Sequence, residues 1–243
     1  PIPDGACSWT APFPKGGPFR VCPCDLHRRG FARKIKRQQG HNMTELAVLT
    51  GDIVKSRALP PGDLDRVFAA LSETATVLEG WQNMPVRLSR FRGDGWQMVV
   101  HPAHAYRAAL LLRAAVRAVG KGIDTRIGIG LGDGTVHGPD LADADGPAFV
   151  NSGHALDTMS KRARLAFPDG PPALRTAMPL TDQIIAGWTP RQAEIALALL
   201  APDEPTQTDV ADRLGLAQQT VQKQANAAGL PALEEVCEMV ETV

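Results

Sequence analysis

Two strand patterns joined by a tight turn constrain the fold of this 243-residue chain more than any other feature. Residues 86–91 and 96–100 have the composition of strands, and Arg92-Gly93-Asp94-Gly95 lies between them. An Asp-Gly step in this position is a strong hairpin signal, because a type I′ turn needs positive φ at both central residues. The sequence therefore predicts two neighbouring antiparallel strands near the middle of the chain.

Four further segments extend this hairpin into a recognisable order of elements. An apolar run at 46–50 predicts a central strand, and apolar residues recur on one face of a helix at 64–78. A second helix is expected at 104–119, and a strand at 126–132. The order β-α-β-β-α-β is the split βαβ of ferredoxin-like folds, in which the first and third strands are antiparallel neighbours. We expect an α+β fold, with another helix at 149–164.

Two aspartates occupy the strand ends that this topology brings together. Asp52 follows the first strand, and Asp94 precedes the third. Converging carboxylates suit a magnesium-triphosphate site, since Mg²⁺ takes one or two carboxylates together with phosphate oxygens. A purely structural alternative is that Asp94 serves the turn and Asp52 the entry to a helix.

The residues around both aspartates resemble those of class III nucleotide cyclases. The matching segments are Gly51-Asp52-Ile53-Val54, Arg90-Phe91-Arg92-Gly93-Asp94-Gly95, Arg126-Ile127-Gly128-Ile129 and Val150-Asn151. The resemblance implies that Asp52 and Asp94 bind Mg²⁺ or Mn²⁺ and that Arg90 lies near a purine base. It also implies that Ile53, Lys55 and Arg57 lie beside the phosphates, that Asn151 orients the ribose, and that the protein is a homodimer.

The same resemblance breaks down at one position that matters for chemistry. Family cyclases have an arginine four residues after the ribose-binding asparagine, where this chain has Ala155 beside His154. Losing such a cation lowers the rate of phosphoryl-type chemistry by about 10³-fold or more. We therefore expect nucleotide binding without efficient cyclisation. The alternative is an active nucleotide cyclase or nucleotidyltransferase in which Arg162 or Arg164 replaces the missing cation.

Gly128, Gly130 and Gly132 do not form a dinucleotide-binding fingerprint. They alternate with apolar residues within a predicted strand, whereas the fingerprint lies at a turn from a strand into a helix. Bare glycines on one strand face permit the close approach of a helix or a ligand. We expect a helix.

The last third of the chain has the pattern of a helix-turn-helix. Trp188-Thr189-Pro190 begins a helix, and Ala211, Gly215 and Val221 have the spacing of a helix crossing, a tight turn and a core position. This region carries three basic and nine acidic residues, which opposes phosphate binding, so a docking or dimerisation module is the alternative. The side chains expected to contact DNA are Gln218, Gln219, Thr220, Gln222 and Lys223.

Residues 1–42 differ in composition from the rest of the chain. They carry eight Lys or Arg against two acidic residues, and Met43 looks like a natural start. We interpret them as a disordered basic leader; a nucleic-acid-binding tail is the alternative. Cys7, Cys22 and Cys24 lie there without the complete ligand spacing of a zinc site.

No segment is long and apolar enough for a signal peptide or a membrane span, and the sparse cysteines fit a cytoplasmic protein.

The combination of both halves resembles the SatD family of small bacterial proteins. The residues that carry this resemblance are Thr50 to Arg57, Asp145-Gly146-Pro147-Ala148-Phe149 and Ala155-Leu156-Asp157. The resemblance implies an intracellular, regulatory role. We divide the chain into a cyclase-like nucleotide-binding domain at 43–178 and a helix-turn-helix domain at 179–243 that contacts DNA. A non-catalytic interaction module is a further alternative.

Overall fold

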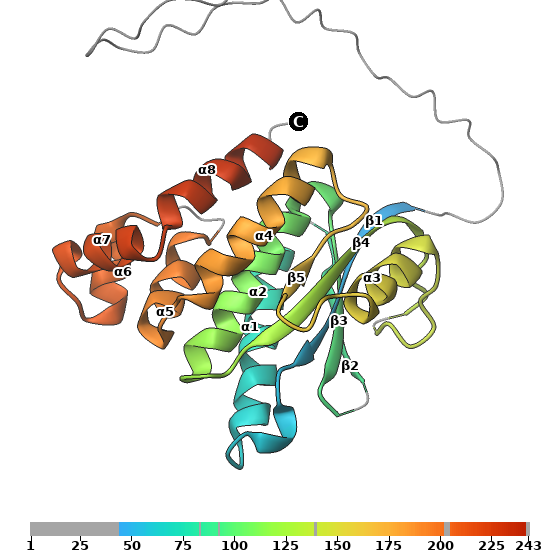
Figure 1. Cartoon of the computed structure of the whole chain (residues 1–243), viewed down its shortest axis with the longest axis horizontal. Coiled ribbons are helices and arrows are strands. Elements are labelled where there is room, and N and C mark those ends of the chain that lie inside the picture. Colours follow the sequence, from blue (N-terminus) through green and yellow to red (C-terminus); the bar gives the residue numbers. More distant parts are fainter. Residues whose placement is uncertain (1–43, 83, 92, 139, 202–204, 242–243) are drawn as a thin grey trace, which may run out of the picture. The chain divides into compact units, whose positions relative to one another are not determined.

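The computed structural model describes residues 44–82, 84–91, 93–138, 140–201 and 205–241. The predictions for residues 1–42, including Cys7, Cys22 and Cys24, lie outside this range. The described part contains a five-stranded sheet with helices on both faces (Figure 1). This confirms the α+β class.

The sheet has the strand order β2-β3-β1-β4-β5, with β1 in the centre. β1 is antiparallel to both β3 and β4, as the split βαβ order predicts. β5 adds a parallel edge to β4, so the sheet is mixed rather than antiparallel throughout. The strands are β1 (Thr44–Ile53), β2 (Arg87–Phe91), β3 (Gly95–Val100), β4 (Thr125–Gly134) and β5 (Leu165–Ala166).

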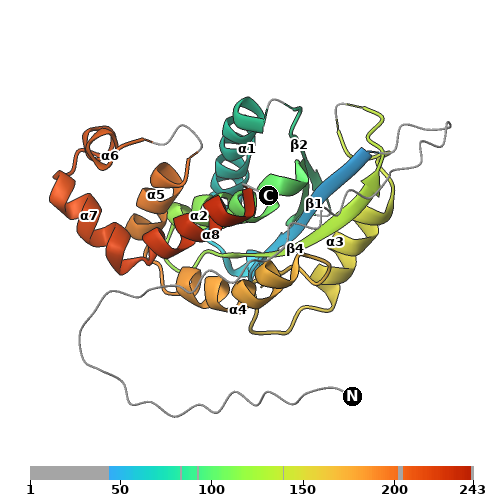
Figure 2. The same ribbon diagram turned by 90° about the horizontal axis from the view of Figure 1, so that it is seen from above.

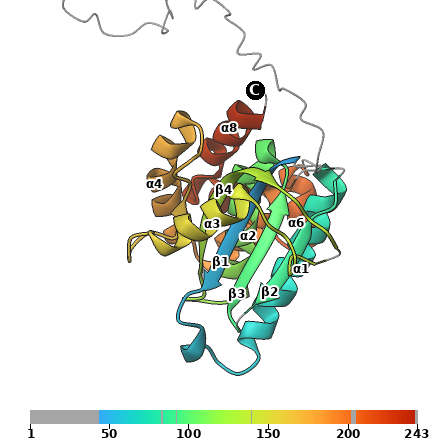
Figure 3. The ribbon, with the colours of Figure 1, turned by 90° about the vertical axis from the view of Figure 1, so that its right-hand side faces the viewer.

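β1 is buried on both faces because helices cover the sheet from two sides (Figure 3). α1 (Asp63–Gln82) and α2 (Ala105–Val119) pack over the face that carries Ala47 and Leu49. α3 (Pro147–Asp157) covers the opposite face, where Leu46 and Val48 lie with Ala148 in a smaller core. The 3-10 helix η1 (Ser56–Ala58) follows β1, and a second 3-10 helix, η2 (Pro102–His104), lies between β3 and α2.

α3 is shorter than the helix expected at 149–164. It ends at Asp157, and a turn follows in which the Ala163 N–H donates to the Ser160 carbonyl over 3.1 Å. The Arg164 carbonyl then accepts from the Ile127 N–H at 2.8 Å, next to β5. Pairing with β4 thus takes the backbone groups that a longer helix would have used internally.

The alternating glycines of β4 bring α3 into backbone contact with the sheet. A Cβ on Gly130 would lie 2.2 Å from the Ser152 nitrogen, and one on Gly128 would lie 2.5 Å from the Leu156 nitrogen. Real Cβ atoms do not approach backbone atoms so closely. This confirms that the glycines serve helix packing.

Five helices follow the sheet in the residues that the structure describes. Thr189 caps the start of α5, as the sequence predicts, and the structure adds a capping box with Gln192. α5 packs on α2. The predicted domain boundary between residues 178 and 179 falls inside α4, and the division into domains stays a prediction. The helices are α4 (Pro172–Ala186), α5 (Pro190–Leu199), α6 (Gln207–Leu214), α7 (Gln218–Ala227) and α8 (Leu230–Glu241).

A buried arginine network joins α2 to the start of β4 and to α4. Arg113 is fully buried and donates to Asp124 at 2.9 Å and to Asp182 at 2.6 Å. Arg117 donates to Asp124 at 2.9 Å and to the Trp188 carbonyl at 2.5 Å. These bonds tie α4 and the start of α5 to the helix that covers the sheet, and α5 lies beside α2 (Figure 2).

Cys237 lies on α8 and is completely buried. Burial raises the pKa of its thiol to about 12. A thiol in this state is inert towards oxidants and metals. None of the described helices combines the length and apolarity needed to cross a membrane.

Candidate functional site

The end of β1 and the start of β3 place Asp52 and Asp94 in adjacent positions. Asp52 is the cross-strand partner of Gly95, the residue after Asp94. The Ile53 N–H donates to the Asp94 carbonyl over 3.2 Å, which holds the two chain segments together. The predicted meeting of these strand ends is confirmed.

Arg126 on β4 binds the Asp52 carboxylate from the other side. The two residues are cross-strand partners, and Arg126 Nε donates to Asp52 Oδ1 at 2.9 Å. A second guanidinium nitrogen donates to Asp52 Oδ2, so the pair is forked. The side chains keep 34% and 26% of their exposure, which leaves this ion pair open to solvent and ligands.

Hydrogen bonding to Asp52 is the main reason that the pKa of Arg126 is raised, and partial burial acts against it. The charges of Asp157 and Asp94 raise this pKa further. The negative charges of three carboxylates thus act on the Arg126 guanidinium. Sequence reasoning noticed Arg126 only within a family motif, because its partner is set by the register between β1 and β4.

The segment after β1 turns sharply past Asp94. Ser56 Oγ donates a short hydrogen bond to Asp94 Oδ2. Lys55 has a left-handed backbone with φ of 53°, which starts η1. Lys55 and Arg57 are exposed, whereas Ile53 is buried. The turn that follows Asp52 therefore carries two exposed cationic side chains, and among the described residues neither has an ion-pair partner. The Ile53 side chain is buried, so this residue exposes no side-chain group to a ligand.

Gly51 allows the strand to pass over a buried tryptophan. A Cβ at Gly51 would lie 2.4 Å from the indole ring of Trp96. The Trp96 Nε1 donates to Thr125 Oγ1 at 3.2 Å, and that hydroxyl donates to the Asp52 carbonyl at 2.7 Å. These bonds hold the backbone of Asp52 in place.

Arg90 lies on the face of the sheet opposite to Asp52. Thr50, two residues before Asp52 on the same strand face, hydrogen bonds to Ser152 of α3 at 2.7 Å. Arg90 instead lies over the Phe68 ring of α1, at 3.9 Å from its centroid. Its Nε also donates to the Gly93 carbonyl at 2.8 Å. Arg90 thus lies beside the turn that carries Asp94 but on the α1 face of the sheet, and its expected place near a purine base stays a prediction.

Asn151 and Ala155 lie on α3. The Asn151 Nδ2 donates to the Leu131 carbonyl at 2.9 Å, so its amide is engaged with β4. Ala155 is buried with 2% exposure. Arg164, the suggested replacement cation, donates to the carbonyls of Lys161 and Ala163 in its own turn, and Arg162 is exposed.

The donors at the strand ends suit a hard divalent cation that also binds a ligand. In the part of the chain that is described, no group of three or more His, Cys, Asp or Glu side chains could hold a metal ion. Mg²⁺ needs only one or two carboxylates when phosphates and water complete its shell. Each oxygen of Asp52 keeps a lone pair beyond its bond to Arg126. The two carboxylates are therefore ligands of the kind that Mg²⁺ or Mn²⁺ accepts when phosphate and water oxygens complete the shell.

The side chains expected to contact DNA lie on one exposed surface of α7. Val221 and Ala225 are buried, whereas the other face of α7 is exposed. α6 and α7 are joined by a short turn in which Gly215 has φ of 64°. The exposed side chains are Gln218, Gln219, Thr220, Gln222 and Lys223.

No protein-family model and no curated protein matches this chain. Among solved structures, the guanylyl cyclase Cya2 is similar at 16% identity over 53% of this chain and 76% of that chain, with a TM-score of 0.40. A bacterial light-regulated adenylyl cyclase is similar at 18% identity over 52% and 77%, with a TM-score of 0.39. The guanylate cyclase domain of RhGC from Catenaria anguillulae in complex with GTP shows 22% identity over 48% and 74%, with a TM-score of 0.37. From a likeness of this extent we draw no functional conclusion.

Proposed function

We propose that this protein is a regulator in which a nucleotide with Mg²⁺ binds at the ends of β1 and β3, and a C-terminal helix-turn-helix binds DNA. The observation that supports nucleotide binding is the adjacency of Asp52 and Asp94. The exposed Lys55 and Arg57 in the turn after β1 add positive charge for phosphates.

Each residue has a separate task in this proposal. Asp52 and Asp94 hold the metal ion, which supplies charge neutralisation for the phosphates. Ser56 orients the Asp94 carboxylate through its hydrogen bond. Arg126 neutralises Asp52 in the absence of ligand, and the incoming cation has to share that carboxylate with it.

We expect binding without cyclisation, because Ala155 of α3 and Arg164 in the turn that follows supply no free positive charge for the transferring phosphate. The buried Ala155 offers no charge, and the Arg164 guanidinium is bonded to backbone carbonyls of its own turn. Incubation with ATP, GTP, CTP or UTP and Mg²⁺ or Mn²⁺ should therefore yield no cyclic product. A cyclic product that disappears in both Asp52→Asn and Asp94→Asn would favour the enzyme alternative.

Isothermal titration calorimetry with Mg-nucleotides tests the carboxylate pair. We expect at least one nucleoside triphosphate to bind, and Asp94→Asn to weaken it by about tenfold or more, since a metal ligand is lost. Asp52→Asn should do the same while also freeing Arg126. Neither change lies in the core, so both variants should remain folded.

Asp133→Asn is the matched control, because Asp133 is an exposed carboxylate of β4 away from the two strand ends. It should leave the affinity unchanged. Absence of heat with every triphosphate would contradict the proposal, as would equal weakening by Asp133→Asn.

The second half of the proposal rests on the arrangement of α6 and α7. Val210 and Ala211 of α6 and Val221 of α7 are buried, so the two short helices cross through small and β-branched side chains. The exposed amides of α7 can donate to and accept from base edges in a major groove. A homodimer, which we also propose, would present two such helices to paired half-sites.

Fluorescence anisotropy with labelled duplex DNA at low salt tests this half. We expect weak binding that Lys223→Ala reduces, with the slope of log affinity against log salt falling by about 1 for the lost phosphate contact. Lys121→Ala, which removes an exposed lysine in the turn before β4, should leave both quantities unchanged. If DNA does not bind even at the lowest salt, α6 and α7 form a docking or dimerisation module instead.

A further inference from the structure

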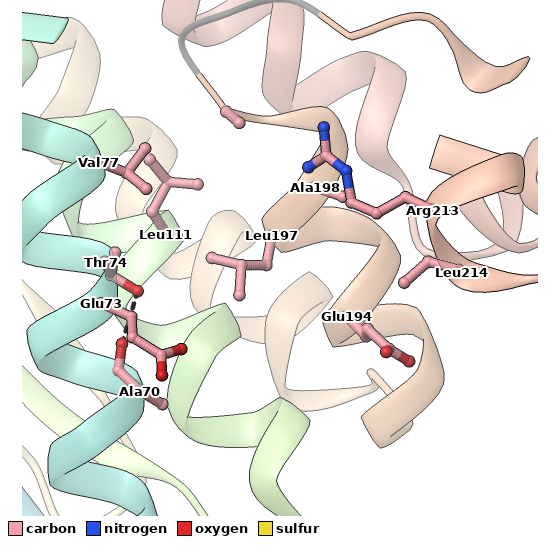
Figure 4. Close-up of a pocket in the computed structure, with 11 residues that line it drawn as sticks. Ala70, Glu73, Thr74, Val77, Leu111, Glu194, Leu197, Ala198, Arg213 and Leu214 are labelled. Atoms are coloured by element: carbon pink, nitrogen blue, oxygen red, sulfur yellow. Dashed lines mark hydrogen bonds between the residues drawn. The ribbon is translucent and has the colours of Figure 1, made fainter. Parts of the chain in front are cut away.

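A cavity lies between the helices that cover the sheet and the C-terminal helices (Figure 4). α1 and α2 form one wall, and α5 and α6 form the other. Its volume of about 280 Å³ is close to the lower end of the range for small-molecule sites, which is roughly 300 to 1,000 Å³. None of the site residues discussed above lines it.

The walls of this cavity are mainly apolar. Figure 4 shows Val77 and Leu111 on one side and Leu197 facing them from α5. Val77 keeps 48% of its exposure although it is a large aliphatic side chain. An apolar molecule in the cavity would cover it and gain the free energy of removing that surface from water.

Glu73 is the carboxylate of this cavity that is available to a cationic ligand. Glu73 of α1 and Glu194 of α5 line it, against the single cation Arg213 of α6. Among the described residues, Glu73 has no ion-pair partner, whereas Glu194 pairs with Arg191 at 2.6 Å. The region from residue 188 onwards carries nine acidic and three basic residues, which adds a negative field.

We infer that this cavity binds a small hydrophobic cation, with its apolar body between Val77 and Leu197 and its charge near Glu73. Such a ligand would touch α1 and α5 together, and would therefore stabilise the packing of α5 beside the helices that cover the sheet. The inference is independent of nucleotide binding at Asp52 and Asp94.

Methyl NMR of the full chain, with labelled Val and Leu, tests this with benzyltrimethylammonium as the probe. Its uncharged carbon isostere, neopentylbenzene, and the anion 4-phenylbutyrate are the comparison ligands. We expect the cation to shift the methyl signals of Val77, Leu111 and Leu197 and to bind about fivefold or more tightly than either comparison ligand.

Two pairs of variants locate the probe. Ala70→Phe fills the cavity from the half-buried position of α1 and should reduce affinity about tenfold or more. Ala69→Phe adds the same ring at the exposed neighbouring position and should have no effect. Glu73→Gln should weaken the cation about two- to fivefold, as expected for one exposed charge, whereas Glu79→Gln should not.

Three outcomes would overturn the inference. The methyl signals could stay unchanged at millimolar probe, binding could survive Ala70→Phe, or the uncharged isostere could bind as tightly as the cation. The first two results remove the site, and the third removes the charge selectivity. Nucleotide calorimetry on the same sample keeps this result separate from that of the carboxylate pair.

Discussion

Replacement of Gly130 by alanine is expected to destabilise the protein by about 3 kcal/mol or more, at the upper end of overpacking costs. The added Cβ would lie 2.2 Å from the Ser152 nitrogen and 2.5 Å from the Ala148 carbonyl oxygen. Both atoms belong to the backbone of α3, so no side-chain rotation relieves the contact. Urea unfolding followed by circular dichroism measures the loss.

Gly153→Ala is the matched control for this prediction. Gly153 lies on the same helix, and a Cβ there would meet nothing within 4 Å. Alanine should be neutral or stabilise the helix by about 0.5 to 1 kcal/mol, because glycine has the lower helix propensity. Equal unfolding midpoints for Gly130→Ala and the unchanged chain would show that α3 does not lie on β4 as described.

Arg113→Ala is the second large effect, with an expected loss of about 3 to 5 kcal/mol in the free energy of unfolding. Arg113 is fully buried, and its guanidinium binds both Asp124 and Asp182. Its removal leaves the Asp182 carboxylate without its guanidinium and Asp124 with Arg117 alone, inside a low-dielectric core. Thermal and chemical denaturation would both report the change.

Arg191→Ala provides the comparison at the surface. Arg191 pairs with Glu194 at a similar distance, but both side chains are more than 40% exposed. Its loss should cost less than about 1 kcal/mol, because solvent screens exposed ion pairs. If both variants lost the same stability, the buried network would not hold α4 to α2.

Local patterns were sufficient for the framework of the site. The predicted hairpin is confirmed, and the order of elements then places β1 beside β3. The type I′ turn expected at Asp94-Gly95 is wrong, because Gly95 already pairs with Phe91 within β3 and the positive φ lies at Gly93, at 84°. The glycines of β4 were interpreted as a packing surface because a bare strand face admits a helix backbone. Each of these conclusions needs only short-range geometry or a small set of allowed topologies.

Contacts between distant segments were not predictable in the same way. The pairing of Asp52 with Arg126 depends on the register of β1 against β4, and a shift of one residue would turn every side chain to the other face. Arg90 was grouped with the aspartates by motif, yet its position on β2 turns it towards Phe68 of α1.

By itself, then, the amino-acid order determined the α+β class, the hairpin, the meeting of Asp52 and Asp94, and the helix starts in the last third. These depend on turn chemistry, periodicity and caps, which act over a few residues. Tertiary structure alone decided that Arg126 neutralises Asp52, that Arg113 joins α2 to Asp124 and Asp182, and that a cavity remains between α1 and α6. Those features arise where segments far apart in the chain pack, and their side-chain contacts depend on register and helix position rather than on neighbouring residues.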